Sequence, residues 1–563
     1  MNLSRRDLLK RSAQSCLVAG CTPLSSLLLQ QVPAGSSVST RCINVVNFIR
    51  GVEPRMPTDL LLPVQKQMEL ILEHRLPATW LLQYDALVSG AFVAFLKAQM
   101  TSEQEVGFWF EMNEKLCDAA GVAWRGRPGF EWDSEPPVAF TIGYSKAERV
   151  KLADAAMQTF KATFGHFPRA VASWNLDSIS MAHLSEQYGV DAFAVCRDQI
   201  ATDGFTIWGA PIAGYYPSKV NCWSPALNVR NQIHTPVFRM LGQDPVYYYQ
   251  RGYPTPDGRR ITEPDTMEPV WNSGRSPGFV AGFLNMISKE PCLEFAYAQL
   301  GQENSFGWPE MEAAYPAQMM ALAKLRDSGS VHVETLSETG RRFKRAFSTT
   351  PVQAQVQLQD PFSNTAPAER SIWYQSRFYR SNLHLSGDLP FFRDITVYSD
   401  RFPQPFLTSA TRDKNVEQRM PAVLDGYHWS AHPGSRSEAG AGGYFSIAGK
   451  LLRLNGKAHV FEAGSALVAD LPLTGKGTLR VRFEEQDISI ILPSSTEGPL
   501  TLSFQWDPDK AALVEIQPDR IAYRWQGCNY YLAVHEGQVN STATGFSVTQ
   551  GNGGIRLGLA QAS

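Results

Sequence analysis

The chain has 563 residues, of which 44% are hydrophobic, and a formal net charge of −2 at pH 7. That hydrophobic content supports packed cores and excludes an intrinsically disordered protein. The near-zero charge argues against nucleic acid or an anionic membrane surface as the partner. A chain of this length is expected to form two or three domains.

The first segment is expected to be an export signal rather than part of the fold. SRRDLLKRSA carries paired arginines ahead of a weakly apolar stretch, which is typical of a twin-arginine signal. Two processing sites stay open: LVAGC (17–21), which would make Cys21 a lipidated N-terminus, and VPA (32–34). We expect residues 1–34 to form the signal and the protein to be periplasmic or lipid-anchored at the cell envelope. The only expected membrane attachment is the lipid, because no later run approaches the ~20 apolar residues of a spanning helix.

Seven short apolar runs between residues 42 and 345 predict the strands of a parallel sheet. They lack clean alternation, which suits strands that are buried on both faces. The runs are INVVNFIRG (43–51), ATWLLQYDAL (78–87), EVGFWFEMN (105–113), AVASWNLD (170–177), AFAVCRDQ (192–199), PVFRMLGQD (236–244) and FAYAQLGQEN (295–304).

Amphipathic helical patterns separate these runs. One covers 145–165, with a serine cap and a closing glycine, and another covers 308–329, where Pro316 should interrupt the helix. Alternation of strands and helices predicts a parallel sheet with helices outside. Seven strands without a glycine fingerprint after the first favour an α/β fold built as a seven-stranded (β/α) barrel over a dinucleotide-binding sheet.

The pattern changes after about residue 345. Short runs with period-two alternation and turn residues about every ten positions predict an antiparallel β-sandwich over residues 346–563. The six cysteines beyond Cys21 are scattered, with no pair at metal-ligand spacing. A zinc site or a disulfide framework is therefore not expected, although one isolated disulfide stays open.

Polar residues follow every predicted barrel strand, where active sites of such barrels are built. Any single polar residue at a strand end is more often a turn former or a helix cap. For Asp177, which precedes SISMAH, helix capping is a particularly strong alternative. A polar residue after all seven strands instead predicts a ligand-facing rim. The candidate catalytic acids are Asp177, Glu303, Glu111, Asp198 and Asp203, and the candidate binding residues on the strand ends are Arg50, Gln83, Asp85, Asn113, Trp174, Gln302 and Asn304.

Aromatic residues lie in the loops beyond these strand ends, and Trp208, Tyr215 and Trp308 are the candidates for ligand contact. Acids, amides and flat rings together suit a sugar, because carboxylates act on the glycosidic bond, amides bind hydroxyl groups and rings stack on C–H faces. The alternative is that the rings only pack the long loops. We expect a carbohydrate substrate, and no nucleic-acid partner.

Metal and serine chemistry have weaker support. No histidine lies at a predicted strand end, and no GxSxG nucleophile elbow occurs in the barrel region. We expect no metal and no cofactor, while a carboxylate-bound divalent ion stays open.

Several motifs resemble an uncharacterised family of exported bacterial proteins. They are NFIRGVEPR (47–55), ATWLLQYDAL (78–87), WFEMNEKL (109–116), DQIATDGFTIWG (198–209) and GQENSFGW (301–308). The family is assigned to the glycoside hydrolase/deacetylase seven-stranded (β/α)-barrel superfamily, which also includes glycoside hydrolase families 57 and 38. By strand count the resemblance puts a nucleophile at Asp177 and an acid at Glu303, although family 57 has glutamate and then aspartate at these places.

Three functions follow as hypotheses. The first is an exported glycoside hydrolase that uses Asp177 as nucleophile or base and Glu303 as the acid, with Glu111, Asp198 and Asp203 in reserve. The second is a metal-dependent polysaccharide deacetylase or lyase. The third is a glycan-binding lipoprotein without catalysis. The sugar, its linkage and the oligomeric state do not follow from the sequence.

Overall fold

A computed structural model describes residues 40–561, except for 56, 203, 241–252, 255–259, 262–265, 360–368, 432–439, 476, 493–497 and 512. The expected export signal and Cys21 therefore lie outside the described residues. Within them, no helix is both long and apolar enough to cross a bilayer.

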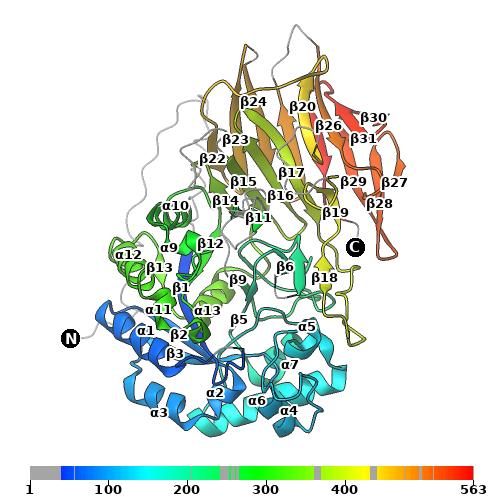
Figure 1. Ribbon diagram of the computed structural model, residues 1–563. Helices are drawn as coiled ribbons and strands as arrows, with labels where there is room; N and C mark the ends of the chain where they lie inside the picture. Colours follow the sequence, from blue (N-terminus) through cyan, green and yellow to red (C-terminus); the bar gives the residue numbers. More distant parts are fainter. Residues whose placement is uncertain are drawn as a thin grey trace, which may run out of the picture. The chain divides into compact units, whose positions relative to one another are not determined.

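The N-terminal half contains a nearly closed barrel of mostly parallel strands, surrounded by helices (Figure 1). The hydrogen-bonded order of the sheet is β12-β1-β2-β3-β4-β5-β9-β8, with β13 paired to β1. All neighbours are parallel except β8, which runs antiparallel to β9. The strands are β1 (Thr40–Ile49), β2 (Ala78–Leu82), β3 (Gln104–Trp109), β4 (Ala170–Ala172), β5 (Ala192–Cys196), β8 (Gly214–Tyr215), β9 (Val237–Met240), β12 (Phe295–Leu300) and β13 (His332–Val333).

Side-chain packing connects β12, at one end of this sheet, with β9, the last parallel strand before β8 at the other end. The ring of Phe238 on β9 lies 4.9 Å from that of Tyr297 and 5.9 Å from that of Phe295, both on β12. These contacts bridge β9 and β12, which share no ladder of hydrogen bonds among the described pairings. Each of the seven predicted runs covers most or all of a barrel strand, and β8 and β13 are additions of two residues each. The end of the second run, Tyr84–Leu87, forms the helix α2 instead of continuing the strand.

Helices cover the outside of the barrel. The caps predicted for the helix over 145–165 are confirmed. Ser145 and Glu148 form a capping box at the start of this helix, and Gly165 ends it in the left-handed conformation. The interruption expected near Pro316 is also present, between α11 and α12. The helices are α1 (Leu61–Glu73), α2 (Tyr84–Leu87), α3 (Gly90–Gln99), α4 (Glu114–Ala120), α5 (Pro136–Ala139), α6 (Lys146–Phe164), α7 (Ser178–Tyr188), α9 (Asn272–Arg275), α10 (Pro277–Ser288), α11 (Trp308–Met311), α12 (Tyr315–Asp327) and α13 (Leu336–Ala346).

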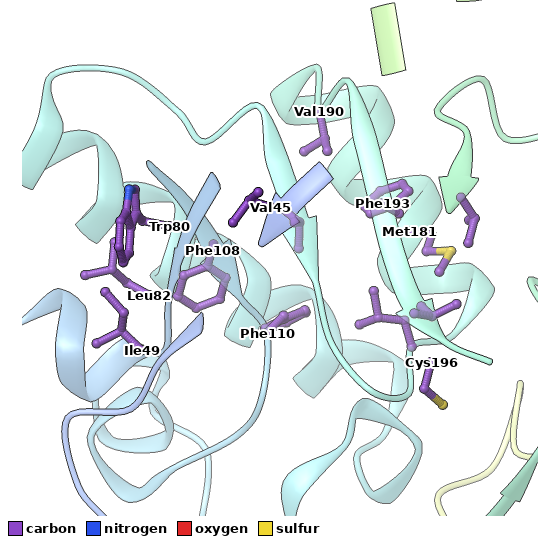
Figure 2. Close-up of a cluster of buried hydrophobic side chains, with 14 of the residues drawn as sticks. Val45, Ile49, Trp80, Leu82, Phe108, Phe110, Met181, Val190, Phe193 and Cys196 are labelled. Atoms are coloured by element: carbon purple, nitrogen blue, oxygen red, sulfur yellow. The ribbon is translucent and has the colours of Figure 1, made fainter. Parts of the chain in front are cut away.

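Both faces of the barrel strands are buried. Figure 2 shows part of the layer between strands and helices, where Ile49, Trp80 and Phe108 of β1, β2 and β3 gather in one cluster with Met181 of α7. A separate cluster contains Val46, Leu81, Trp109 and Tyr297, among others, from the alternate positions of these strands. Burial on two sides explains why the sequence shows continuous apolar runs instead of alternation.

Two antiparallel sheets form most of the C-terminal part and share one hydrophobic cluster, with Tyr374 of one sheet stacked 5.6 Å from Phe483 of the other. The first sheet contains β14 (Gln353–Gln357), β15 (Glu369–Gln375), β16 (Tyr379–Ser386), β17 (Leu389–Val397), β19 (Ala422–Asp425), β20 (Gly442–Ile447), β21 (Lys450–Leu451), β26 (Leu500–Gln505), β30 (Gln538–Thr542) and β31 (Gly545–Thr549). The second contains β22 (His459–Ala463), β23 (Ala466–Leu473), β24 (Gly477–Phe483), β25 (Asp487–Ile491), β27 (Leu513–Ile516), β28 (Arg520–Trp525), β29 (Cys528–Glu536) and β32 (Ile555–Gly558). The predicted fold class is confirmed, while the expected boundary at residues 345–346 stays a prediction.

A small sheet joins the two parts of the chain. The hairpin β6 (Gln199–Thr202) and β7 (Phe205–Trp208) follows β5, and β18 (Val416–Arg419) adds to β7 in parallel. A separate two-stranded ladder pairs β10 (Tyr253–Pro254) with β11 (Arg260–Ile261). Neither feature was expected from the sequence.

Candidate active site

A buried arginine and two buried glutamates meet at the carboxyl ends of the barrel strands. Arg50 directly follows β1, Glu111 follows β3 and Glu303 follows β12. Arg50 Nη1 lies 2.8 Å from Glu111 Oε2, and its Nη2 lies 3.5 Å from Glu303 Oε2. All three side chains are almost completely buried. One cation therefore stands between two carboxylates where burial makes uncompensated charge expensive.

Two of the predicted binding residues hold the turn that carries Arg50. Asn304 Oδ1 accepts a hydrogen bond from the Arg50 backbone N–H (2.9 Å), and its Nδ2 donates to the Arg50 carbonyl (2.9 Å). The Asp85 carboxylate accepts from the backbone N–H groups of Gly51 (3.1 Å) and Val52 (3.0 Å). Both side chains position the site through the backbone.

Glu111 has two further partners. Trp132 Nε1 donates to Glu111 Oε2 (3.1 Å), and Gln83 Nε2 lies within 3.5 Å of the same oxygen. The Arg50 guanidinium also lies over the Trp132 ring, 3.9 Å from its centroid. Burial raises the pKa of Glu111, Arg50 opposes that shift, and the neighbouring Glu303 adds to it.

Glu268 is a third acid of this cluster. Its Oε1 accepts a hydrogen bond from Gln302 Nε2 (3.3 Å), and its Oε2 accepts from Trp271 Nε1 (3.0 Å). Burial and then the negative charge of Glu303 raise the pKa of Glu268 to about 7. The carboxyl group is therefore partly protonated at neutral pH, which a general acid requires.

Aromatic rings continue from this cluster into the barrel. Phe48 lies under Arg50 at 5.2 Å and stacks on Trp109 at 3.9 Å, and the ring of Trp174 meets both edge-on. Trp174 is partly exposed, while the other two rings are buried. Trp174 is therefore the ring of this set that a ligand can reach.

Several buried polar atoms of the rim have no hydrogen-bond partner in the described residues. They include Gln83 Oε1, Gln302 Oε1, Arg50 Nε and both side-chain polar atoms of Asn175. Leaving such an atom unpaired costs roughly 1–3 kcal/mol, so several of them at one end of the barrel need an explanation. A bound ligand or water that supplies the missing hydrogen-bond partners would explain them.

The structure places Asp177 and Asp198 in other surroundings. Asp177 is the N-cap of α7, where its carboxylate accepts from the backbone N–H groups of Ile179 and Ser180 and lies 3.1 Å from Arg149 Nη1. Asp198 lies 3.1 Å from Arg239 and 2.7 Å from Arg380. None of these described contacts involves Arg50, Glu111 or Glu303, so the structure does not bring the expected Asp177–Glu303 pair together through them.

The remaining candidates have mainly structural contacts in the described residues. Asn113 Oδ1 caps α4, Tyr215 donates its hydroxyl hydrogen to the Cys222 carbonyl, and the Trp208 ring lies 5.7 Å from Tyr427. Trp308 is the first residue of α11 and packs against the core between strands and helices. Asp203 lies outside the described residues.

The cluster also contains residues outside the predicted catalytic and binding set, chiefly Glu268, Trp132 and the pair Glu53–Arg55. Arg55 donates to both carboxylate oxygens of Glu53 (2.7 and 2.6 Å) and lies 4.6 Å from the Trp132 ring centroid. Their sequence signal is weak, because each stands in an irregular loop next to proline or an aromatic residue, as in MEPVW and FEWD.

A metal site of the kind a deacetylase requires does not fit these residues. Within the described part of the chain, no three His, Cys, Asp or Glu side chains gather in a way that could hold a metal ion. The carboxylates of the rim are instead bonded to arginine, tryptophan or amide N–H groups. No step through a metal follows from this donor set.

Comparisons with known proteins give similarity of structure only. No protein-family model and no curated protein matches the chain. A crystal structure from Parabacteroides distasonis, provisionally described as a glycoside hydrolase/deacetylase, aligns with a TM-score of 0.50 and 13% identity over 69% of this chain and 91% of the other. It shows that the two chains share a fold.

Two further structures align more weakly. They are provisionally described as polysaccharide deacetylases, from Mycobacterium smegmatis (TM-score 0.33, 12% identity, 59% of this chain and 98% of the other) and Pseudomonas aeruginosa (TM-score 0.33, 10% identity, 55% and 92%). Both scores are below the level that indicates a shared fold.

Proposed function

We propose that the protein is a glycoside hydrolase, with Glu268 as the general acid and Glu303 as the carboxylate that faces the anomeric carbon. The observation that carries this proposal is the pair itself. Gln302, the chain neighbour of Glu303, donates a hydrogen bond to Glu268 (3.3 Å), and burial and then the charge of Glu303 raise the pKa of Glu268 to about 7. A protonated carboxyl group beside a second carboxyl group is the machinery of glycosidic bond cleavage.

In the proposed reaction, Glu268 gives its proton to the glycosidic oxygen as the bond to the anomeric carbon breaks. Both of its oxygens already accept hydrogen bonds, from Gln302, Trp271 and Thr266, which orients the carboxyl group. The leaving alcohol takes the proton. Water then supplies the hydroxyl group at the anomeric carbon and returns a proton to the acid–base pair.

Glu303 would stabilise the positive charge that develops on the sugar. Its Oε2 lies 3.5 Å from Arg50, and Ser305 donates a hydrogen bond to its Oε1. Arg50 is shared with Glu111, so Glu111 fixes the position of the arginine and limits how much of its charge Glu303 receives. Retention of anomeric configuration would mean that Glu303 bonds covalently to the sugar, and inversion that it activates water.

Two other observations support a sugar as the substrate. The partly exposed Trp174 offers a flat ring next to Phe48, the ring that lies under Arg50, and C–H faces of a sugar can stack on it. A structure that shares the fold is itself provisionally described as a glycoside hydrolase/deacetylase. The paired arginines near the N-terminus support export, so we propose that the substrate is met outside the cytoplasm.

The test is product release from a panel of aryl glycosides and oligosaccharides, with and without EDTA, by wild type, Glu268→Gln, Glu303→Gln and Asp177→Asn. We expect EDTA-resistant hydrolysis that falls at least about 1000-fold in both glutamate variants. Asp177→Asn should mainly lower the thermal unfolding temperature. Glu310→Gln is the control, because Glu310 lies on α11, after the site, and its described side-chain contact is an exposed ion pair with Arg275.

The same panel distinguishes the other hypotheses. Hydrolysis that survives both glutamate substitutions but is lost in a normally folded Asp177→Asn would return the nucleophile to Asp177. EDTA-sensitive release of acetate would contradict the glycosidase and support a deacetylase. Binding of an oligosaccharide without any product would indicate a glycan-binding protein.

A further inference from the structure

Two glutamines at the ends of β2 and β12 have the same arrangement. Gln83 Nε2 is directed at Glu111 Oε2 (3.5 Å), and Gln302 Nε2 donates to Glu268 Oε1 (3.3 Å). Each amide nitrogen is therefore committed to a carboxyl group. The two amide oxygens are buried and accept no hydrogen bond from the described residues. Both glutamines thus present an acceptor that lacks a donor.

The arginines of the cluster are already committed to its own acids. Arg50 is shared between Glu111 and Glu303, and Arg55 forms a two-point contact with Glu53. Arg50 Nε has no hydrogen-bond partner in the described residues, and the Arg50 guanidinium lies over the Trp132 ring. A guanidinium binds a ligand carboxylate best through two parallel N–H groups, and both arginines already use N–H groups of this kind on acids of the cluster.

The charges of the cluster lead to the same conclusion. Glu53, Glu111 and Glu303 face two arginines, and Glu268 gains its own negative charge as the pH rises through about 7. With four acidic side chains against two guanidinium groups, the cluster holds no spare positive charge for an anion. An anionic ligand would be repelled at short range in a poorly solvated site.

We infer that the sugar ring bound beside these acids is not anionic, and that two of its hydroxyl or amino groups donate hydrogen bonds to Gln83 Oε1 and Gln302 Oε1. Rings that carry a carboxylate, sulfate or phosphate at this position are excluded. The inference rests on the proposed glycosidase function of the same site and adds the class of substrate. Gln83 and Gln302 are then residues that determine specificity.

The first experiment compares matched substrates. Wild type is assayed with 4-nitrophenyl glycosides of glucose, galactose, mannose and xylose in both anomers, and with 4-nitrophenyl glucuronide and galacturonide. We expect kcat/KM for the best neutral glycoside to exceed that for either uronide by at least about 100-fold, because a site with unpaired acceptors and no spare positive charge discriminates strongly against an anion.

The second experiment assigns the two glutamines. Monodeoxy analogues of the best substrate are assayed on wild type, Gln83→Met and Gln302→Met, with Gln99→Met on the exposed end of α3 as the control. In wild type, removal of the hydroxyl group that a glutamine binds should lower kcat/KM about tenfold or more. In the variant that lacks that glutamine, kcat/KM for the same deoxy substrate should be almost equal to kcat/KM for the full substrate. Gln99→Met should behave as wild type.

The outcomes separate this inference from the proposed function. Hydrolysis of a uronide as fast as its neutral partner, lost in Glu268→Gln and Glu303→Gln, would overturn the substrate class and leave the glycosidase intact. Titration of Glu268→Gln with neutral oligosaccharides and with oligouronides of equal length measures binding affinity without turnover. Tighter binding of the oligouronides, or binding of neither set, would overturn the inference, and absence of any hydrolysis would overturn the proposed function as well.

Discussion

At the scale of single residues, Trp132 is the side chain whose role can be isolated most cleanly. Its indole N–H donates to Glu111, and its ring lies against Arg50. Trp132→Phe removes the donor and keeps an aromatic face. Because a donor to a carboxylate stabilises its charged form, we expect the pKa of Glu111 to rise further and the acidic limb of the pH–rate profile to move to higher pH. Activity near neutrality should fall roughly tenfold or more, since hydrogen bonds to charged groups contribute about 1.5–3 kcal/mol.

A tryptophan in the same loop provides the matched control for this prediction. Trp124 Nε1 donates to the Phe130 carbonyl and has no described contact with the acids, so Trp124→Phe should leave the profile in place. An unchanged acidic limb in Trp132→Phe would mean that Glu111 does not titrate in catalysis.

The raised pKa of Glu268 leads to a prediction about folding stability. Its pKa in the folded protein is raised to about 7 from an ordinary value of 4.5. A raised pKa contributes stability that is complete below about pH 4.5 and is lost as the pH rises through 7. Glu268→Gln removes this loss, so the variant should gain stability relative to wild type between pH 5 and 8, by up to about 3 kcal/mol. Urea unfolding of both proteins across this range tests it, and a constant difference would show that Glu268 does not titrate there.

The sequence predicts these residues unevenly, for a physical reason. Arg50, Glu111 and Glu303 lie within a few residues of the ends of apolar strands. The ends of parallel strands meet at one rim, so their sequence positions predict their place in the fold. Glu268 and Trp132 lie in irregular segments whose path has no period to read. Asp177 also follows a strand, but its local contacts with the first turn of α7 satisfy its carboxylate, as the capping alternative predicts.

At the scale of elements, Gly301 determines how β12 delivers Glu303 to the rim. It has a φ of 123°, and a Cβ atom there would lie 2.0 Å from the Val46 carbonyl oxygen on β1. Gly301→Ala should therefore reduce stability by at least about 2 kcal/mol and reduce activity through displacement of Glu303. Gly90→Ala is the control, since that position begins α3 and has open space around it. Thermal unfolding and kcat/KM of both variants test this, and wild-type behaviour of Gly301→Ala would contradict it.

Elements formed by regular periodicity were predictable, and elements formed by distant pairing were not. The seven barrel strands carry their signal in apolar runs, and Pro316 marks the break between α11 and α12. In contrast, β18 pairs with β7 across about two hundred residues of sequence, so neither strand reveals its partner locally. The two-residue strands β8 and β13 are too short to have a period.

At the scale of the whole molecule, buried charges connect the barrel to the antiparallel sheets. Asp198, after β5, lies 3.1 Å from Arg239 on β9 and 2.7 Å from Arg380 on β16, and Arg380 reaches Asp394 on β17 at 3.4 Å. Arg380 Nη1 also donates to the carbonyl of Ala210. Asp198, a reserve acid in the sequence interpretation, has contacts typical of an interface.

This network predicts unequal effects of its members. Arg380→Met leaves Asp198 and Asp394 buried with less compensation and should cost about 3–5 kcal/mol of stability. Asp394→Asn should cost far less, because burial raises the pKa of Asp394 to about 6 despite Arg380. Since that pKa is raised, the stability Asp394 contributes is complete below about pH 4 and is lost as the pH rises through 6, and the asparagine variant should lack this loss. Thermal unfolding of wild type and both variants from pH 4 to 8 checks the order and the pH dependence. An Arg380→Met variant that unfolds at the wild-type temperature but hydrolyses substrate more slowly would contradict this prediction. The network would then contribute to catalysis rather than hold the barrel and the antiparallel sheets together.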